Sequence, residues 1–393
     1  MSDWEKVVRG AAHIEVEDHL REALASGRKL RVKLGIDPSS PDIHLGHTVV
    51  LGKLRDFQEL GHTAVLIIGD FTARIGDPSG QNATRRPLEV EEVESNAKTY
   101  LDQVFRVLDP DATEVRHQSE WFDAMTIADV IRLAGKVTLA QITTRDDFRQ
   151  RLEGNNAIGL HELLYPLLQG YDSVAVAADV ELGGTDQLFN LLFGRDMQRE
   201  SGMPPQDVLT TPLLEGLDGT QKMSKSLGNY VGVSDHPAEM FGKLMSVPDN
   251  LIGRYFLLVV GSSEDEMAEV QRRLDAGENP RDLKAELARA IVTRFHSAEE
   301  AAAAEEAFTY QFRHGRQPAE IEERALAAKS TTVAGALLDL ELVTSKGEAR
   351  RLVTQHGVKL NGIVLEDAGS EYQPASGDLW QIGKRRYVRV KAS

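Results

Sequence analysis

The sequence predicts an α/β protein built on a parallel sheet, and three neighbouring segments carry this prediction. Residues 31–36 are half apolar and end at a polar loop marked by prolines, which indicates a buried strand followed by a turn. From His44 onward apolar residues recur at helical spacing, and residues 64–69 form a second apolar strand. A strand, a helix and a strand in this order are typical of the βαβ unit of a parallel sheet.

The junction between the first strand and the helix is the first candidate site. His44 to His47, with the sequence H-L-G-H, stand at the helix start, where free N–H groups and the helix dipole favour a phosphate. Gly46 lets a ligand approach the backbone closely, and the two histidines share one face of the first turn. Taken alone, the four residues fit ordinary helix capping equally well.

A second motif changes this balance. Lys222-Met-Ser-Lys-Ser226 follows the first motif after about 180 residues, and the pair resembles the class I aminoacyl-tRNA synthetases. Other nucleotidyltransferases share H-x-G-H, but K-M-S-K-S is rarer among them. The resemblance implies a Rossmann-like catalytic domain.

The composition is that of a soluble globular chain with two or three domains. The 393 residues are 41% hydrophobic, with no apolar run near the length of a membrane span and no expected signal peptide. The absence of cysteine excludes disulfides and thiolate metal sites, and predicts a reducing cytoplasm. A net charge of −16 argues against one broad basic surface, so any nucleic acid must be contacted locally.

Two consecutive loops offer further ligand contacts. Residues 69–80 contain three glycines and a proline and follow the second strand, at the sheet edge where open α/β proteins bind ligands. Asp70, Thr72 and Asp77 are the candidates there. Turn chemistry explains Asp70 equally well, whereas ligand binding is favoured for Asp77. Residues 81–86 add two adjacent arginines, which suit a phosphate clamp.

The middle of the chain predicts a helix over residues 89–108, a strand over 113–117 and helices over 121–152. In a class I synthetase the last stretch corresponds to an insertion between the two halves of the nucleotide-binding fold. Its apolar face needs a cover and comprises Met125, Ile127, Val130, Ile131, Leu139 and Ile142. We prefer a second copy of the chain, which gives a two-fold dimer, over packing onto its own sheet.

A polar helix face precedes the K-M-S-K-S motif. Tyr165, Gln169 and Asp172 are spaced i, i+4 and i+7 among leucines, so a largely buried helix carries a phenol, an amide and a carboxylate on one side. Buried polar groups need partners, and a small polar ligand is one. Residues 180–187 then predict a strand running into a helix, where Asp186 can accept from ribose hydroxyls.

These motifs narrow the resemblance to the bacterial tyrosyl-tRNA synthetases. Y-x-x-x-Q-x-x-D followed by G-G-T-D-Q, with G-x-D-P before H-x-G-H and G-D-P-S-G after it, extends the likeness over essentially the whole chain. It implies that the substrate tyrosine is bound by Asp172 at its phenol, by Tyr165, Gln169 and Asp77 at its ammonium group, and further by Thr72 and Gln187. It implies an ATP side lined by Gly35, Asp37, Gly46, His47, Gly184, Asp186 and Gln187. The triphosphate would be held by Ser39, His44, Arg85, Lys222, Lys225 and Ser226.

Two positions depart from the commonest family pattern. Lys33 stands where many relatives have a tyrosine that touches the substrate phenol, so the second phenol contact stays open. Gln81 stands where many relatives have a lysine in the mobile loop, which shifts the charge of the clamp onto Arg85 and Arg86.

The chain changes character beyond the K-M-S-K-S motif. Residues 237–324 are charged and helical in pattern, which predicts a small bundle suited to the anticodon end of a tRNA. Residues 331–393 are weakly basic and combine a capped helix at Ser345, an Asn-Gly hairpin turn and a basic last strand. They resemble the small S-four RNA-binding domain, with candidate phosphate contacts at Arg350, Arg351, Lys384, Arg385 and Arg386.

The resemblance implies the reaction. The tyrosine carboxylate attacks the α-phosphorus of ATP, pyrophosphate leaves, and a terminal ribose hydroxyl of tRNA(Tyr) then attacks the adenylate. Because the carboxylate is already ionised at neutral pH, no general base is needed, and positioning with charge stabilisation supplies most of the rate. Mg²⁺ would arrive with ATP, and no tightly bound metal is expected.

Two alternatives stay open. A sister synthetase for tryptophan shares the fold and motifs, and an indole N–H also suits Asp172. The other alternative is a catalytically silent RNA-binding relative, which the intact H-x-G-H and K-M-S-K-S residues disfavour. The expected organisation is a catalytic domain over 1–220 with a dimerising insertion at about 120–160, a K-M-S-K-S loop over 221–235, a helical domain over 236–327, a linker near 328–332 and an RNA-binding domain over 331–393.

Overall fold

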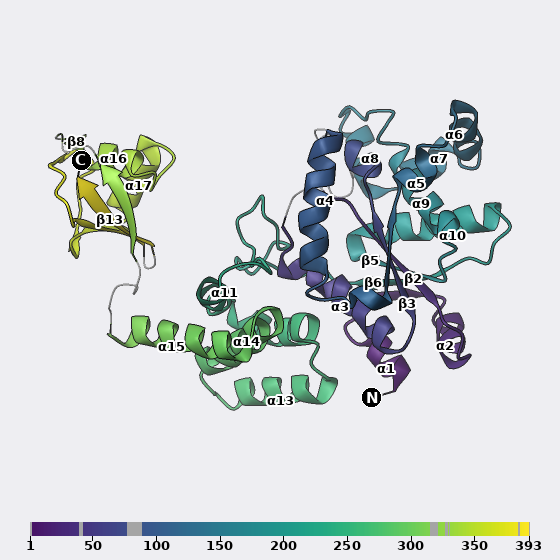
Figure 1. Ribbon diagram of the computed structural model, residues 1–393, viewed down its shortest axis with the longest axis horizontal. Helices are drawn as coiled ribbons and strands as arrows, with labels where there is room; N and C mark the ends of the chain where they lie inside the picture. The colour runs from purple at the N-terminus through teal and green to yellow at the C-terminus, as the bar shows by residue number, and fades with distance from the viewer. Residues whose placement is uncertain are drawn as a thin grey trace. The chain divides into compact units, whose positions relative to one another are not determined.

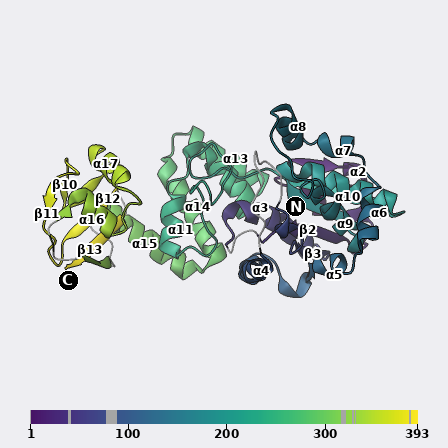
Figure 2. The same ribbon diagram turned by 90° about the horizontal axis from the view of Figure 1, so that it is seen from above.

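The chain divides into two compact units, Met1–Glu305 and Glu306–Ser393. The computed structural model describes residues 2–38, 42–76, 89–314, 321–326, 329, 331–383 and 386–392. Figures 1 and 2 show the first unit as a sheet covered by helices, followed by a bundle of helices, and the second as a small mixed α/β body.

A six-stranded sheet organises the first unit, in the order β1-β6-β5-β2-β3-β4. The parallel strands are β2 (Arg31–Ile36), β3 (Thr63–Ile68), β4 (Thr113–His117), β5 (Val180–Gly184) and β6 (Asp207–Thr211). The predicted parallel sheet is confirmed, and the strands expected at residues 31–36, 64–69 and 113–117 occur to within one residue.

Helices cover both faces of this sheet (Figure 1). On one face lie α3 (Leu45–Glu59) and α4 (Val90–Val104), and on the other α9 (Tyr165–Ala175) and α10 (Leu188–Glu200). Residues 64–68 of β3 are fully buried, which is why this strand is continuously apolar and shows no alternation.

The N-terminal segment contributes two helices and an edge strand of the sheet. α1 (Asp3–Val8) and α2 (Glu17–Ala25) do form, but β1 (His13–Glu15) lies between them and pairs antiparallel with β6 at the sheet edge. A strand of three residues is too short to produce an alternating pattern, so the sequence carried no indication of it.

The insertion consists of short helices, as predicted. They are α5 (Ser119–Phe122), α6 (Ile127–Ala134), α7 (Leu139–Thr143) and α8 (Asp146–Glu153). Phe122, Ile142 and Phe148 pack inward against α9. Other apolar side chains of the insertion are exposed, with Ile127 at 81% and Ile131 at 66%.

The rest of the first unit is helical. Its elements are α11 (Pro237–Leu244), α12 (Ile252–Tyr255), the π-helical turn η5 (Phe256–Val260), α13 (Glu264–Asp275), α14 (Pro280–Phe295) and the start of α15 (Ala298–His314). The prediction of helix up to residue 324 is wrong at its end, because β7 (Glu322–Leu326) is a strand of the second unit. β7 is an edge strand with one neighbour, so its charged sequence lacks the apolar pattern of a buried strand.

Over its described residues, the second unit contains the end of α15, a five-stranded sheet in the order β10-β9-β12-β13-β7, a two-stranded sheet and two further helices. The strands are β8 (Thr331–Thr332), β9 (Val358–Leu360), β10 (Ile363–Val364), β11 (Glu371–Tyr372), β12 (Leu379–Ile382) and β13 (Arg386–Ala392), and the helices are α16 (Val333–Asp339) and α17 (Lys346–Thr354). The Ser345 cap and the Asn361-Gly362 turn are confirmed, with φ of 50° and 84° in the turn. The expected linker is partly strand, since it includes β8.

Candidate active site

His44 and His47 form the cap of α3. His44 Nδ1 accepts a hydrogen bond from Gly46 N at 3.2 Å, and His47 Nδ1 accepts one from His44 N at 3.2 Å. Burial lowers the pKa of His44 to about 2 and that of His47 to about 4, so both rings are neutral at physiological pH. Because Nδ1 of each neutral ring accepts, its proton must sit on Nε2, and each ring offers one N–H donor beyond the helix cap.

The K-M-S-K-S segment (Lys222–Ser226) lies against this helix start. Leu45 N donates to Val231 O at 3.0 Å, which ties the chain after the segment to the first turn of α3. A Cβ placed on Gly46 would lie in ordinary contact with Met223 Cβ at 3.6 Å, so the two motifs are neighbours, and only 3.0 Å from the His44 ring, so the glycine leaves space for the capping histidine. The structure thus brings together two motifs that are far apart in the sequence.

A cavity of about 550 Å³ separates the two motifs. Its wall includes His44, Gly46, His47, Gly184, Asp186, Gln187, Lys222, Lys225 and Ser226. Lys222 Nζ lies 3.2 Å from Asp186 Oδ2, and Lys225 Nζ donates to Asp42 O. Burial lowers the pKa of Lys225. Lysines, histidine N–H groups and a helix N-terminus around one space favour a ligand rich in phosphate.

A second cavity of about 240 Å³ adjoins the first, because His47, Val50, Gly184 and Gln187 line both. Its wall also includes Gly35, Asp37, Thr72, Tyr165, Gln169 and Asp172. The polar face of α9 predicted from the i, i+4, i+7 spacing therefore faces a cavity, at the carboxyl ends of β2 and β5.

Asp172 is the buried acid of this second cavity. One carboxylate oxygen accepts from Gln118 Nε2 at 2.7 Å and the other from Trp121 Nε1 at 3.2 Å. Burial raises the pKa of Asp172 to about 7, against the opposing charge of Lys33 and these two hydrogen bonds. Sequence reasoning missed both partners, although Gln118 directly follows β4 and so lies at the edge where polar ligand contacts were expected.

Asp37 joins the strand β2 to the polar face of α9. Its carboxylate accepts from Tyr165 OH at 2.8 Å and from Thr72 Oγ1 at 2.7 Å. A Cβ on Gly69 would lie 2.0 Å from Asp37 Oδ1, so only glycine fits beside this carboxylate. Gln169 Oε1 is buried in the wall with no hydrogen-bond partner among the described residues, which leaves an acceptor for a ligand.

Lys33 and Asp70, both considered for ligand contacts from the sequence, instead bond to other residues of the chain. Lys33 is fully buried and lines neither cavity, and its Nζ reaches from β2 to α9, where it donates to Ser173 Oγ at 2.8 Å. Asp70 accepts from Ser119 N at 2.9 Å and from Ser119 Oγ at 2.7 Å, which supports the turn interpretation.

Comparisons with known proteins agree with this geometry. A family model described as tRNA synthetases class I (W and Y) matches residues 25–313. A tyrosine–tRNA ligase from Oleidesulfovibrio alaskensis is 51% identical over 386 residues, covering 98% of this chain and 97% of the relative. One from Coxiella burnetii is 50% identical over 390 residues, covering 99% and 98%.

This chain belongs to the tyrosyl-tRNA synthetases of class I. Solved tyrosyl-tRNA synthetases share the fold of the synthetase. The structure from Archaeoglobus fulgidus, complexed with L-tyrosine, gives a TM-score of 0.63 at 24% identity over 77% of this chain and 98% of that one. The truncated mitochondrial enzyme from Aspergillus nidulans gives 0.67 at 19% identity, over 80% and 95%.

Several expected site residues of the synthetase lie outside the described residues. They are Ser39, Asp77 and Arg85, with Gln81 and Arg86 of the same loop, and Lys384 and Arg385 of the tail. The described tail candidates are Arg350 and Arg351, both exposed at α17, and Arg386. Arg386 donates to Glu341 O at 3.0 Å and to Leu342 O at 3.1 Å, so backbone carbonyls hold its guanidinium.

Within the described ranges, no group of three His, Cys, Asp or Glu side chains could hold a metal ion. Over the same part of the synthetase, no helix has the length and apolar character that crossing a membrane requires.

Proposed function

We propose that this synthetase activates tyrosine with ATP, releases pyrophosphate and transfers tyrosine to the terminal ribose of tRNA(Tyr). The observation that carries the proposal is the pair of adjoining cavities. One contains a buried carboxylate, and the other lies between the H-x-G-H and K-M-S-K-S residues. A phenolic amino acid and a triphosphate would then meet where the cavities join, near His47 and Gln187.

The smaller cavity supports tyrosine as the substrate. Asp172 would accept from the substrate phenol, while Gln118 and Trp121 hold its two oxygens in place. The unpaired Gln169 Oε1 would accept from the substrate ammonium group, near Tyr165 of the same cavity wall. Asp77, which lies outside the described residues, is proposed for the same role on the family resemblance alone. Thr72 acts through Asp37, to which its hydroxyl donates.

The larger cavity supports ATP. The carboxylate oxygen of tyrosine forms a bond to the α-phosphorus, and the bond to the bridging oxygen breaks, so that pyrophosphate leaves with the electron pair. His44 and His47 would donate through Nε2–H, and Lys222, Lys225, Ser226 and Arg85 would balance the charge that develops on the leaving oxygens. Gly35, Gly184 and Asp186 would hold the nucleoside, and Mg²⁺ would arrive with ATP as part of the substrate.

A two-fold dimer is favoured by the insertion. Ile127, Ile131 and Leu139 are 81%, 66% and 62% exposed and come from neighbouring short helices. Exposed apolar patches mark interaction sites, and a symmetric pair of chains would bury this face against its copy. Replacing Ile127 and Ile131 by Asp should shift the synthetase from dimer to monomer in analytical ultracentrifugation, whereas Val364→Asp, an exposed apolar control in β10, should not.

The second unit is favoured as an S-four-type RNA-binding module. α17 presents Arg350 and Arg351 in its last turns on a chain whose overall charge is −16. A local basic cluster on an acidic protein attracts phosphates. Binding of tRNA by this module would serve protein synthesis, for which we propose a cytoplasmic location.

The direct test is ATP–pyrophosphate exchange with each of the twenty amino acids. We expect exchange with tyrosine, and exchange with tryptophan in place of tyrosine would support the sister enzyme. Absence of exchange with every amino acid, from folded protein that still binds tRNA, would support the silent relative.

A further inference from the structure

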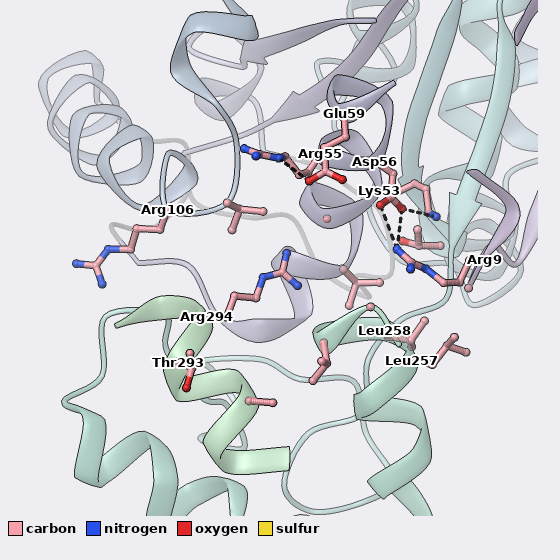
Figure 3. Close-up of a pocket in the computed structure, with 18 residues that line it drawn as sticks. Arg9, Lys53, Arg55, Asp56, Glu59, Arg106, Leu257, Leu258, Thr293 and Arg294 are labelled. Atoms are coloured by element: carbon pink, nitrogen blue, oxygen red, sulfur yellow. Dashed lines mark hydrogen bonds and ion pairs between the residues drawn. The ribbon is translucent and has the colours of Figure 1, made fainter. Parts of the chain in front are cut away.

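A third cavity, of about 600 Å³, lies toward the other end of α3 (Figure 3). The histidines occupy the first turn of this helix, whereas Lys53, Arg55, Asp56 and Glu59 of its second half line the cavity. The opposite wall comes from η5 and α14, so the cavity lies where the sheet meets the helical bundle of the first unit. Thr211, at the end of β6, lines both this cavity and the larger catalytic one.

The third cavity is lined by more cations than anions. The cations are Arg9, Lys53, Arg55, Arg106 and Arg294, and the anions are Asp56 and Glu59. The lining therefore has an excess of three positive charges, in a chain whose net charge is −16. Such a local reversal of sign favours an anionic ligand.

Both carboxylates are already shared between cations. Asp56 lies 3.1 Å from Arg9 and 2.8 Å from Lys53. Glu59 pairs with Lys6, and at 3.1 Å with Arg55. Neither carboxylate forms an ion pair with Arg294 of the opposite wall or with Arg106.

Arg294 is the central cation. Figure 3 shows its guanidinium projecting from α14 toward α3, into the space between the two walls. It donates to Val259 O, and among the described residues no carboxylate lies within ion-pair distance. It reaches the backbone of α3, since a Cβ on Gly52 would be in van der Waals contact with Arg294 Nη2, at 3.5 Å. Burial lowers the pKa of Arg294, while the charges of Asp56 and Glu59 on the facing wall act in the opposite direction.

Arg106 is the second cation without a described carboxylate partner. It donates to Val233 O at 3.3 Å, and its side chain is exposed at the cavity rim. Arginine forks match phosphate oxygens geometrically, and a cavity of this volume suits a small ligand.

We propose that this cavity binds a small phosphorylated polyanion, with Arg294 at its centre and Arg9, Arg55 and Arg106 around it. The ligand would bridge α3 and α14 and supply the counter-charge that the walls lack. By binding only the folded arrangement, it would also stabilise the junction between sheet and bundle.

The probe is inorganic tripolyphosphate, titrated by calorimetry into the full-length synthetase. Because the catalytic cavity also suits this anion, two sites are expected in the native protein. Arg294→Gln should weaken tripolyphosphate binding at the third cavity about tenfold or more and leave binding at the catalytic cavity unchanged. Lys225→Ala should weaken the catalytic one. The matched control is Arg289→Gln, which removes the same charge from α14 at an exposed arginine paired with Glu305 at 2.7 Å, and should leave both sites unchanged.

Arg106→Gln gives a second test that does not depend on a half-buried side chain, and it too should weaken the non-catalytic site. A single site that is lost in Lys225→Ala would overturn the proposal, as would equal binding by the native, Arg294→Gln and Arg289→Gln proteins. Weaker tRNA binding by Arg294→Gln with unchanged tripolyphosphate binding would instead make the cavity an RNA contact, and the proposal would be wrong. Tyrosine-dependent ATP–pyrophosphate exchange should be measured on the same variants. It tests the proposed catalytic activity by itself, so a failure of that activity can be told apart from a failure of the third cavity to bind the anion.

Discussion

Lys33 of β2 and Glu181 of β5 form a fully buried ion pair between the sheet and α9, the helix that carries Asp172, with 2.8 Å between Nζ and Oε1. Lys33 Nζ also donates to Gln169 O at 3.1 Å and to Ser173 Oγ, so it ties α9 to the sheet. Its charge also opposes the rise in the pKa of Asp172 that burial causes. Lys33 is therefore a positioning residue for the phenol contact that we propose for Asp172.

Lys33→Met should destabilise the synthetase by about 3–5 kcal/mol, because it leaves Glu181 buried and unpaired. It should also weaken tyrosine binding, since Asp172 loses the nearby positive charge. Urea unfolding and the KM for tyrosine measure the two effects. The double variant Lys33→Met with Glu181→Leu should recover much of the stability. Purely additive losses in that double variant would contradict the ion-pair interpretation.

Tyrosine binding should strengthen as the pH rises from about 6 to about 8. Burial raises the pKa of Asp172 to about 7, and the carboxylate accepts from a phenol better than the protonated acid does. The same pKa also links folding stability to pH. Because the pKa of Asp172 in the folded protein lies above the ordinary value of 3.8, protonation of Asp172 favours the folded state. This contribution to the free energy of unfolding is complete below about pH 4 and is lost as the pH rises through 7. Asp172→Asn should remove the pH dependence of tyrosine affinity in this range. It should also remove the pH-dependent contribution of Asp172 to the free energy of unfolding.

Selectivity against phenylalanine should depend on the same carboxylate. A site built to bond a hydroxyl rejects the analogue that lacks it by about 10⁴–10⁵, a ratio known for tyrosyl-tRNA synthetases as a family. Asp172→Ala should narrow the ratio of kcat/KM for tyrosine over phenylalanine sharply. Trp121→Phe removes one donor to Asp172 and should narrow it less. If Trp121→Phe had the larger effect, Asp172 would not be the main phenol contact.

The activation rate should show no inflection from His44 or His47 near pH 6.5. Their pKa values are lowered to about 2 and about 4, so both rings stay neutral N–H donors over the working range. His44→Ala should slow activation about 10²–10³-fold, as the loss of one preorganised donor does. His44→Gln, which keeps an N–H group, should slow it less. Single-turnover formation of the adenylate in the pH range 5.5–8 measures the pH profile and the rates of the variants. An inflection in the native profile that disappears in His44→Gln would contradict the assignment of a neutral His44 ring.

Removing the second unit should spare adenylate formation and impair tRNA charging. The chain should be cut after His314, because β7 pairs with β13 and belongs to the second unit. The charging defect should grow with salt concentration, since fewer cations then hold phosphates. In the full-length chain, Arg350→Gln with Arg351→Gln should mimic part of the defect, and Arg272→Gln, an exposed change in α13, should not. Full charging by the truncated chain at physiological salt would show that the tail is dispensable.

Local periodicity accounts for what the sequence by itself determined. The parallel sheet, the histidine cap of α3 and the shared face of Tyr165, Gln169 and Asp172 all follow from the spacing of residues a few positions apart. The two motifs also indicated the family, because each is a short continuous segment whose residue types are set by the ligand.

The tertiary structure alone decided the contacts made between distant segments. Gln118 and Trp121 reach Asp172 across 54 and 51 residues of sequence, and no periodic pattern links them. The edge strands β1 and β7 escaped prediction because their partners lie far along the chain and one side of each is unpaired. Burial decided the ionisation of Asp172 and the two histidines, because a charge is stabilised or penalised by everything packed around it. The position of Lys33 between the sheet and α9 likewise depends on contacts with distant segments.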